Sequence, residues 1–181
     1  MKKIVISGGP HTGKTSLLDA LSEKYPAYNY TPEPASSVLE ELALQEGNYW
    51  RDIFDSPLRF CTACMWKSLQ LEKAINPERE ISFQDRSLVD TVAYSRRDNC
   101  AELVPIVKSL AENALYDMVL FCEPVGVMSD RIETDHEAQV THQLLRSAYE
   151  EMDIPIMSIP AISLDDRVQL IERKLLLSFD T

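Results

Sequence analysis

Long apolar runs, internal repeats and low-complexity tracts are all missing from this 181-residue sequence. Because no run has the length and apolar character of a membrane-spanning helix, we expect no membrane partner. The apolar stretch behind Met1-Lys2-Lys3 is far too short for a secretory signal, so we expect the chain in the cytoplasm. Since no linker divides the sequence, we expect a single domain over residues 1–181.

Basic side chains are scarce relative to acidic ones. The 18 lysines and arginines stand against 29 aspartates and glutamates, which gives a formal net charge of −11 and a sequence pI of ≈ 4.7. The phosphate backbone of a nucleic acid would be repelled by such a surface, so the balance argues against a nucleic-acid partner. It does not exclude a small anionic ligand, because arginines can still gather at one place.

Cysteine and histidine are too few, and too irregularly spaced, for a zinc finger. Cys61 and Cys64 form a CxxC, which by itself is compatible with zinc or redox chemistry. No second CxxC exists, the flanking residues have a helical pattern, and His11, His136 and His142 do not complete a finger spacing. We therefore interpret the four cysteines as buried free thiols that pack as small hydrophobic side chains.

The stretch from Lys2 to Leu18 carries the most specific pattern in the chain. Residues 4–6 predict a short strand that is buried on both faces. Residues 8–15 follow at once and match G-x-x-x-x-G-K-[ST], the phosphate-binding loop. Residues 16–21 then have the apolar pattern of a helix. Because the motif lies between a strand and a helix, we predict that the chain binds a nucleoside triphosphate.

The spacing of this motif follows from what a triphosphate requires. Backbone N–H groups converge on phosphate only where side chains do not intrude, which glycine allows. The start of the following helix adds free N–H groups and a positive dipole end. Lys14 is expected to reach the outer phosphates, and Thr15 to place its hydroxyl on Mg²⁺. The predicted nucleotide-binding residues are Gly8, Gly9, Pro10, His11, Thr12, Gly13, Lys14, Thr15 and Ser16.

Strand and helix patterns alternate along the whole chain. The expected strands are 4–6, 27–31, 81–83, 118–122 and 154–159. The expected helices are 16–21, 35–46, 57–75, 88–97, 103–115, 134–151 and 163–179. Pro155 favours an edge position for the last strand, and Pro105 should interrupt the helix in which it lies. This order predicts an α/β fold with a mostly parallel sheet, helices on both faces and right-handed crossovers.

Charged residues follow several of the expected strands. Ligands on open parallel sheets bind at the carboxyl ends of the strands. Glu33, Asp85, Arg86 and Glu123 should therefore lie on the same edge of the sheet as the phosphate loop, although they are far apart in the sequence.

The chain as a whole resembles the P-loop kinases, in particular the deoxynucleoside and thymidylate kinases. It is most similar to the small AAA_28 nucleotide-binding domains, whose relatives include nicotinamide riboside kinase domains. The residues that carry the resemblance are 8–15, 32–34, 83–87, 90–94 and 130–131. It implies a P-loop NTPase fold, a three-layer α/β/α sandwich with a five-stranded parallel sheet in the order 2-3-1-4-5. It also implies an enzyme with a short lid, which we place at residues 125–135.

Four charged residues outside the phosphate loop are candidates for catalysis. Glu33, like the similar Glu-Pro of deoxynucleoside kinases, is a candidate general base, or else an acid at a helix N-terminus. Asp85 would bind Mg²⁺ together with Thr15, or is a surface aspartate in a turn. Arg86 would bind phosphate or acceptor, or forms an ion pair with Glu33 or Asp85. Arg131 would stabilise charge from the lid, or is an exposed loop arginine.

The leading hypothesis is an ATP-dependent kinase for a small hydroxyl-bearing metabolite, nucleoside-like by resemblance, in which Lys14 serves catalysis as well as binding. Its cofactors would be ATP or GTP and Mg²⁺, and its partners the nucleotide and a small-molecule acceptor. The alternative is an NTP-binding regulatory or partner-binding module that hydrolyses slowly and switches shape. A kinase for nucleic-acid ends is disfavoured by the acidic balance. The sequence leaves open the nucleotide base, the acceptor, whether a homodimer forms and whether Glu33 or Asp85 is the general base.

Overall fold

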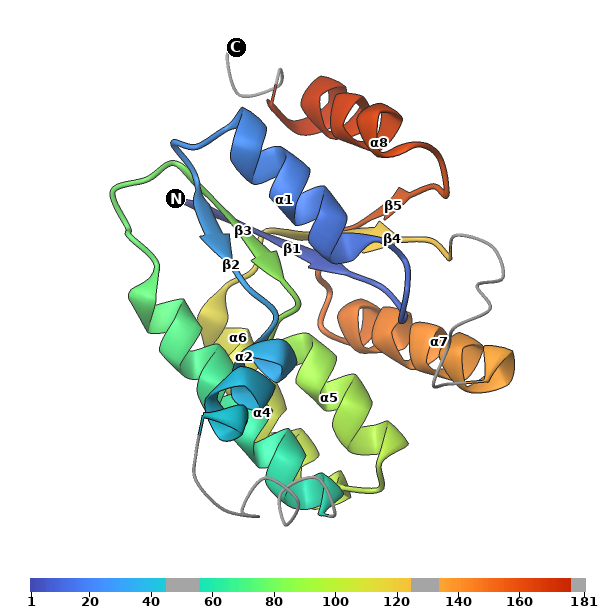
Figure 1. Ribbon diagram of the computed structural model, residues 1–181. Helices are drawn as coiled ribbons and strands as arrows, with labels where there is room; N and C mark the ends of the chain where they lie inside the picture. The colour runs from blue at the N-terminus through green and yellow to red at the C-terminus, as the bar shows by residue number, and fades with distance from the viewer. Residues whose placement is uncertain (45–55, 125–133, 177–181) are drawn as a thin grey trace.

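The computed structural model describes residues 1–44, 56–124 and 134–176, and strands alternate with helices throughout (Figure 1). The strands are β1 Lys2–Ser7, β2 Asn29–Thr31, β3 Ile81–Asp85, β4 Met118–Cys122 and β5 Ile156–Ile159. The helices are α1 Lys14–Lys24, α2 Pro34–Ala43, α4 Pro57–Ala74, α5 Leu88–Arg97, α6 Val104–Ala114, α7 Asp135–Glu151 and α8 Leu164–Ile171. A 3-10 turn, Ala101–Leu103, precedes α6, and a π-helical turn, Glu172–Leu176, follows α8.

The five strands are parallel and lie in the order β2-β3-β1-β4-β5, which confirms the predicted sheet. β1 is central, and Ile6 lies opposite Asp85 of β3 on one side and Leu120 of β4 on the other. β5 is an edge strand, as Pro155 predicts. β3 extends beyond the expected 81–83, so Asp85 is the last residue of a strand and lies beside the end of β1.

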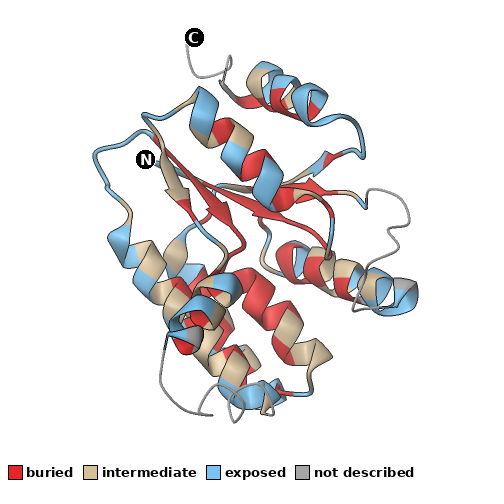
Figure 2. Ribbon diagram, in the orientation of Figure 1, coloured by how far each residue is buried: buried red, intermediate tan, exposed pale blue. Residues whose placement is uncertain are grey.

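Helices cover both faces of the sheet and complete the predicted three-layer sandwich (Figure 1). α1 and α8 lie on one face, while α4, α5, α6 and α7 lie on the other. Alternate side chains of β1 point to opposite faces of the sheet. Ile4 and Ile6 pack with α1 and α8, and Val5 packs with the helices on the other face. The inner strands β3, β1 and β4 are mostly buried (Figure 2), whereas the edge strands β2 and β5 are partly exposed. Ligands on open parallel sheets bind at the carboxyl ends of the strands.

Apart from shifts at the ends of several helices, two helices differ from their predictions. Pro105 does not interrupt a helix: it lies in the first turn of α6, where a missing N–H group would have no partner in any case. The helix expected over 163–179 changes to a π-helical turn after Ile171. Thr134 and Glu137 form a capping box at the start of α7, and Ser163 caps α8.

Some predictions lie outside the described residues. These are residues 45–46 of the helix expected over 35–46, residues 125–133 of the expected lid 125–135, with Arg131 among them, and the end of the last helix. Among the helices that the structure describes, none is long and apolar enough to cross a membrane.

Candidate functional site

The phosphate loop, residues 8–15, leaves the carboxyl end of β1 and leads into α1. A Cβ at Gly8 would lie 2.5 Å from the carbonyl oxygen of Cys122, so only glycine allows the loop to pack against the end of β4. Gly13 has a φ of 75° and is the N-cap of α1 in the left-handed conformation. The loop is therefore folded tightly over the ends of two neighbouring strands, at the N-terminus of a helix.

A cavity of about 360 Å³ lies next to this loop. It is lined by Pro10, His11, Gly13, Lys14, Thr15, Ser16, Glu33 and Arg86. Six of the nine predicted nucleotide-binding residues thus face one space. Gly8, Gly9 and Thr12 are buried and do not line it. We call this space the phosphate-loop cavity.

Lys14 is folded back onto the phosphate loop. Its Nζ donates hydrogen bonds to the carbonyl oxygen of Gly9 at 2.8 Å and to Oγ1 of Thr12 at 3.4 Å. Burial lowers the pKa of Lys14 to about 8, and the nearby charge of Arg86 acts in the same direction. The ammonium group is therefore a buried cation at neutral pH, held by neutral oxygens that an anion could replace.

Thr15 and Asp85 meet where Mg²⁺ would be expected. Oγ1 of Thr15 donates a hydrogen bond to Oδ2 of Asp85 at 2.8 Å. Asp85 is only 1% exposed, and its Oδ1 has no hydrogen-bond partner within the described residues. Burial raises the pKa of this carboxyl group, while the hydrogen bond from Thr15 opposes the shift. Asp85 is buried at the end of a strand, so it is not an aspartate in a surface turn, which was the alternative interpretation.

This pair of residues fits a magnesium ion that also binds phosphate. Mg²⁺ prefers oxygen ligands and is commonly held by one or two carboxylates together with the phosphates of its nucleotide. The orphaned Oδ1 of Asp85 and the hydroxyl of Thr15 supply such oxygens. The described part of the chain contains no group of three or more His, Cys, Asp or Glu residues that could hold a metal by themselves.

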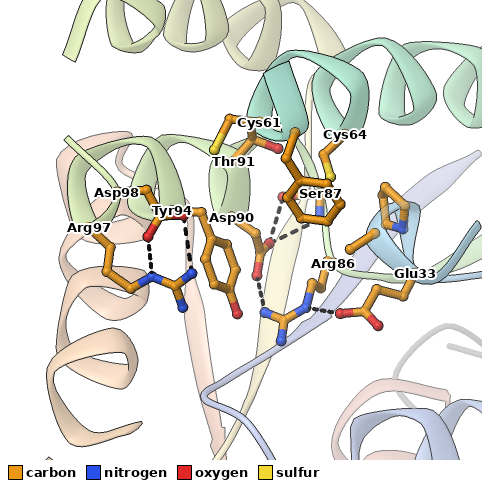
Figure 3. Close-up of a pocket in the computed structure, with 13 residues that line it drawn as sticks. Glu33, Cys61, Cys64, Arg86, Ser87, Asp90, Thr91, Tyr94, Arg97 and Asp98 are labelled. Atoms are coloured by element: carbon orange, nitrogen blue, oxygen red, sulfur yellow. Dashed lines mark hydrogen bonds and ion pairs between the residues drawn. The ribbon is translucent and has the colours of Figure 1, made fainter. Parts of the chain in front are cut away.

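Arg86 forms the ion pairs of a small buried network (Figure 3). Its Nε donates to Oε1 of Glu33 at 2.5 Å, and its Nη1 lies 3.3 Å from Oδ1 of Asp90 and 3.4 Å from the carbonyl oxygen of Gly8. The sequence suggested Glu33 or Asp85 as ion-pair partners; the second carboxylate is instead Asp90. Arg86 has a φ of 69°, so its backbone is held in a conformation that non-glycine residues seldom adopt.

Glu33 precedes α2 and is available as a hydrogen-bond acceptor. It occupies the N-cap position, but its side chain does not cap the helix. Instead Oε1 accepts from Arg86 and Oε2 accepts from Oγ of Ser36 at 2.7 Å. Burial acts to raise the pKa of Glu33, but the charge of Arg86 and these hydrogen bonds outweigh it and lower the pKa. The carboxylate is therefore ionised at neutral pH.

Asp90 is the centre of the network, although no role was predicted for it. Its carboxylate accepts hydrogen bonds from Oγ of Ser7 at 2.6 Å, from the backbone N–H of Ser87 at 2.9 Å and from the hydroxyl of Tyr149. Ser87 and Asp90 also form a capping box at the start of α5. The S-x-x-D spacing is a sequence signal for that box, but it does not indicate the contacts with Ser7, Arg86 or Tyr149.

A second cavity, of about 190 Å³, opens beside this network (Figure 3). It is lined by Glu33, Pro34, Ala35, Phe60, Cys61, Cys64, Arg86, Ser87, Asp90, Thr91, Tyr94, Arg97 and Asp98. We call it the Arg86 pocket. The Tyr94 ring lies between two guanidinium groups, with Cζ of Arg86 5.1 Å and Cζ of Arg97 4.6 Å from its centre. Arg97 is in turn paired with Asp98 at 2.7 Å.

The two cysteines of the CxxC motif contribute to this pocket as thiols. All four cysteines are free, and three of them are buried; Cys64 is half-buried, which the sequence did not predict. Burial raises the pKa of Cys61 and of Cys64 to about 12. Both thiols are therefore protonated near neutral pH, which supports the interpretation of these residues as small apolar side chains.

Arg167 supports the phosphate loop from α8 and was not predicted from the sequence. Its side chain is nearly fully buried, and Nη1 donates to the carbonyl oxygen of Thr12 at 2.7 Å. Nε and Nη2 have no hydrogen-bond partner within the described residues. The two residues in contact are 155 positions apart, and an arginine in an amphipathic helix has no pattern that predicts such a contact.

The fold and the loop geometry define a P-loop nucleotide-binding protein. The AAA_28 family model, described as an AAA domain, matches residues 3–167, and the chain belongs to this family. No curated protein matches the sequence significantly.

Solved structures of NadR proteins share this fold. One, a complex with NAD and AMP-PNP, has a TM-score of 0.72 and 14% sequence identity, covering 95% of this chain and 49% of that chain. Another, a complex with NR, has a TM-score of 0.70 and 16% identity, covering 87% of this chain and 45% of that chain. The present chain thus corresponds to about half the length of these NadR chains.

Proposed function

We propose that this protein is a kinase that transfers the terminal phosphoryl group of ATP or GTP to a hydroxyl group of a small, nucleoside-like metabolite. One observation supports the proposal above all others: Glu33 and Arg86 line both the phosphate-loop cavity and the Arg86 pocket. A donor held in the first space and an acceptor held in the second would meet at these two side chains. A protein that only binds a nucleotide would not require a second cavity next to the phosphate-loop cavity with Glu33 and Arg86 in both linings.

The nucleotide would bind by its phosphates to the backbone N–H groups of the loop and the start of α1. Lys14 would exchange its bonds to Gly9 and Thr12 for bonds to the outer phosphates. Thr15 and Asp85 would hold Mg²⁺, which supplies charge neutralisation at the β- and γ-phosphates when bound.

Glu33 would act as the general base for the acceptor. It accepts the proton of the acceptor hydroxyl as that oxygen forms a bond to the γ-phosphorus, and the bond from this phosphorus to the β–γ bridging oxygen breaks. The products are a phosphorylated acceptor and the nucleoside diphosphate. Arg86 orients the Glu33 carboxylate through the 2.5 Å contact and places positive charge next to the transferred group.

The charges around the Arg86 pocket favour an acceptor without phosphate groups. Both described guanidinium groups of the lining are already paired with carboxylates, Arg86 with Glu33 and Asp90, and Arg97 with Asp98. A phosphate on the acceptor would have to compete with these buried or half-buried pairs. A neutral acceptor with hydroxyl groups avoids that competition and can use the carboxylate oxygens as hydrogen-bond acceptors.

The two NadR structures are complexes with AMP-PNP and with NR, and ligands of these kinds are compatible with the proposal. The cytoplasmic location, the homodimer and the role of Arg131 stay predictions.

The proposal is tested by incubating the purified protein with ATP, Mg²⁺ and fractionated metabolite pools, and by measuring ADP. We expect at least one fraction to increase turnover. Acceptor-independent hydrolysis that no fraction increases would instead favour the regulatory NTP-binding module.

Two variants then separate the roles of the carboxylates. Glu33→Gln should slow transfer by roughly 10²- to 10⁴-fold and leave nucleotide binding nearly intact. Asp85→Asn should change the Mg²⁺ concentration needed for binding and turnover. Equal Mg²⁺ dependence in the two variants would contradict this division of roles.

A further inference from the structure

One peptide group of the phosphate loop is held from both sides. The carbonyl oxygen of Gly8 lies 3.4 Å from Nη1 of Arg86. The N–H of Gly9, which belongs to the same peptide group, donates to Nδ1 of His142 on α7 at 3.2 Å. The carbonyl oxygen of Gly9 in turn accepts from Lys14 and Thr12. The Lys14 ammonium group therefore contacts the peptide group directly after the one that His142 and Arg86 hold.

The hydrogen bonds of His142 determine its tautomer. A backbone N–H can only donate, so Nδ1 must be the unprotonated ring nitrogen. Nε2 then carries the proton and faces Oε2 of Glu123 at 3.2 Å. The ring packs against Phe121, with 4.7 Å between ring centres. Arg146 donates to the other oxygen of Glu123 at 2.7 Å, so the carboxylate that orients the ring is itself fixed.

The hydrogen bond between Gly9 and His142 depends on the close packing of α7 against Gly9. A Cβ at Gly9 would lie 3.2 Å from Cβ of His142 and 3.4 Å from the carbonyl oxygen of Ala138. The sequence suggested that Gly9 makes room for phosphate. In the structure Gly9 makes room for α7, which brings His142 within hydrogen-bond distance of the loop.

We propose that His142 is a positioning residue for nucleotide binding, which fixes the Gly8–Gly9 peptide group through a neutral imidazole. It ties the loop to α7 and, through Glu123, to the carboxyl end of β4. The inference goes beyond the proposed phosphoryl transfer and rests only on its nucleotide-binding half, so its test needs no acceptor.

The charged groups that face His142 come from three elements. Glu123 follows β4, Arg146 lies on α7, and Lys14 lies at the start of α1. Burial lowers the pKa of His142; Glu123 acts to raise it, whereas Arg146 and Lys14 lower it further. The imidazole is therefore neutral at neutral pH. Its protonation in acid would place an N–H at Nδ1 facing the N–H of Gly9, so nucleotide affinity should fall as the pH falls below the ordinary histidine range.

Two substitutions at His142 separate its two hydrogen bonds. In His142→Asn the side-chain oxygen can take the place of Nδ1 and accept from Gly9. In His142→Gln the amide reaches the place of Nε2 and Glu123, but the acceptor for Gly9 is lost. His136→Asn is the matched control, because His136 is exposed on the same helix. Affinity for Mg²⁺·AMP-PNP is measured by calorimetry across the acid range, with thermal melts to confirm folding.

We expect His142→Gln to weaken binding roughly 2- to 12-fold, the range for one hydrogen bond. His142→Asn should bind like the parent at neutral pH and lose the acid decline, and the control should match the parent at every pH. If His142→Gln binds as tightly as His142→Asn, or if the control shifts equally, the inference is wrong. If the parent does not bind Mg²⁺·AMP-PNP at all, the result contradicts the proposed function itself.

A measurement on the ligand-free parent keeps the test decisive if a variant does not fold. The amide resonance of Gly9 and the ring nitrogens of His142 are followed by NMR during an acid titration. The Gly9 shift should titrate together with the His142 ring. A Gly9 resonance that ignores the protonation of His142 would overturn the inference.

Discussion

Removal of the Asp90 carboxylate should destabilise the protein far more than removal of the carboxylate of Asp98, the residue that follows the last residue of the same helix. Both aspartates pair with an arginine and line the Arg86 pocket, but their burial differs. The Asp90 side chain is 2% exposed and its partner Arg86 9%, whereas the Asp98 and Arg97 side chains are 24% and 31% exposed. Asp98→Ala is therefore a matched control for Asp90→Ala.

The magnitudes follow from this difference. Breaking a buried ion pair by removing one partner costs about 3–5 kcal/mol, because the other charge stays buried. An ion pair near the surface contributes about 0–1 kcal/mol. Asp90→Ala also removes the acceptor of the N–H of Ser87 and one acceptor of the Tyr149 hydroxyl, whereas Arg86 keeps its pair with Glu33, so we place its cost near the middle of the buried range.

Urea unfolding followed by far-UV circular dichroism measures this difference. With a slope of about 2 kcal/mol per molar urea, Asp90→Ala should lower the unfolding midpoint by about 2 M and Asp98→Ala by less than about 0.5 M. Asp90→Asn should fall between them, since it keeps the shape and one acceptor. Equal midpoints for Asp90→Ala and Asp98→Ala would refute the assignment of Asp90 as the centre of a stabilising network.

Three further predictions concern the phosphate loop and its neighbours. Lys14→Ala should weaken Mg²⁺·AMP-PNP binding roughly 10- to 100-fold in calorimetry, the range for a charge-assisted hydrogen bond; unchanged affinity would contradict the nucleotide assignment. Arg167→Leu should weaken the same binding and lower the melting temperature, while exposed Arg173→Leu should do neither; equal effects would assign Arg167 no special role. Burial acts to raise the pKa of Glu33, but Arg86 outweighs it and lowers this pKa in the folded protein. The ionised Glu33 therefore stabilises the fold at pH values above its unfolded pKa, and this stabilisation is lost as the pH falls through its folded pKa. Glu33→Gln should therefore flatten the acid side of the stability profile, and an unchanged profile would contradict the ion pair.

The sheet order could be predicted because its determinants are local or general. The phosphate-loop motif places β1 before α1, and alternating patterns with right-handed crossovers leave few arrangements for the other strands. The predicted helix boundaries were less accurate where a proline is compatible either with a break in a helix or with its first turn. The sequence predicts a break in the helix at Pro105, but in the structure Pro105 lies in the first turn of α6, where proline is tolerated.

The site could be predicted only in part, for a similar reason. Strand ends bring Glu33, Asp85 and Arg86 to one edge of the sheet, and this neighbourhood follows from the topology. The partners that determine their chemistry depend on how distant helices pack. His142 contacts a loop residue 133 positions away, and Asp90 receives a hydrogen bond from a serine 83 positions away. No spacing rule indicates such contacts, because they are set by side-chain packing and not by periodicity.

Phosphoryl transfer at the junction of the two cavities is tested most directly by the stoichiometry of the reaction. Once a metabolite fraction increases turnover, its active component is incubated with γ-labelled ATP and Mg²⁺, and ADP and labelled product are measured together. The proposal predicts equimolar ADP and phosphorylated acceptor, with both lost in Lys14→Ala and transfer slowed in Glu33→Gln. Label that appears only as inorganic phosphate, at the same rate with and without the metabolite, would contradict it.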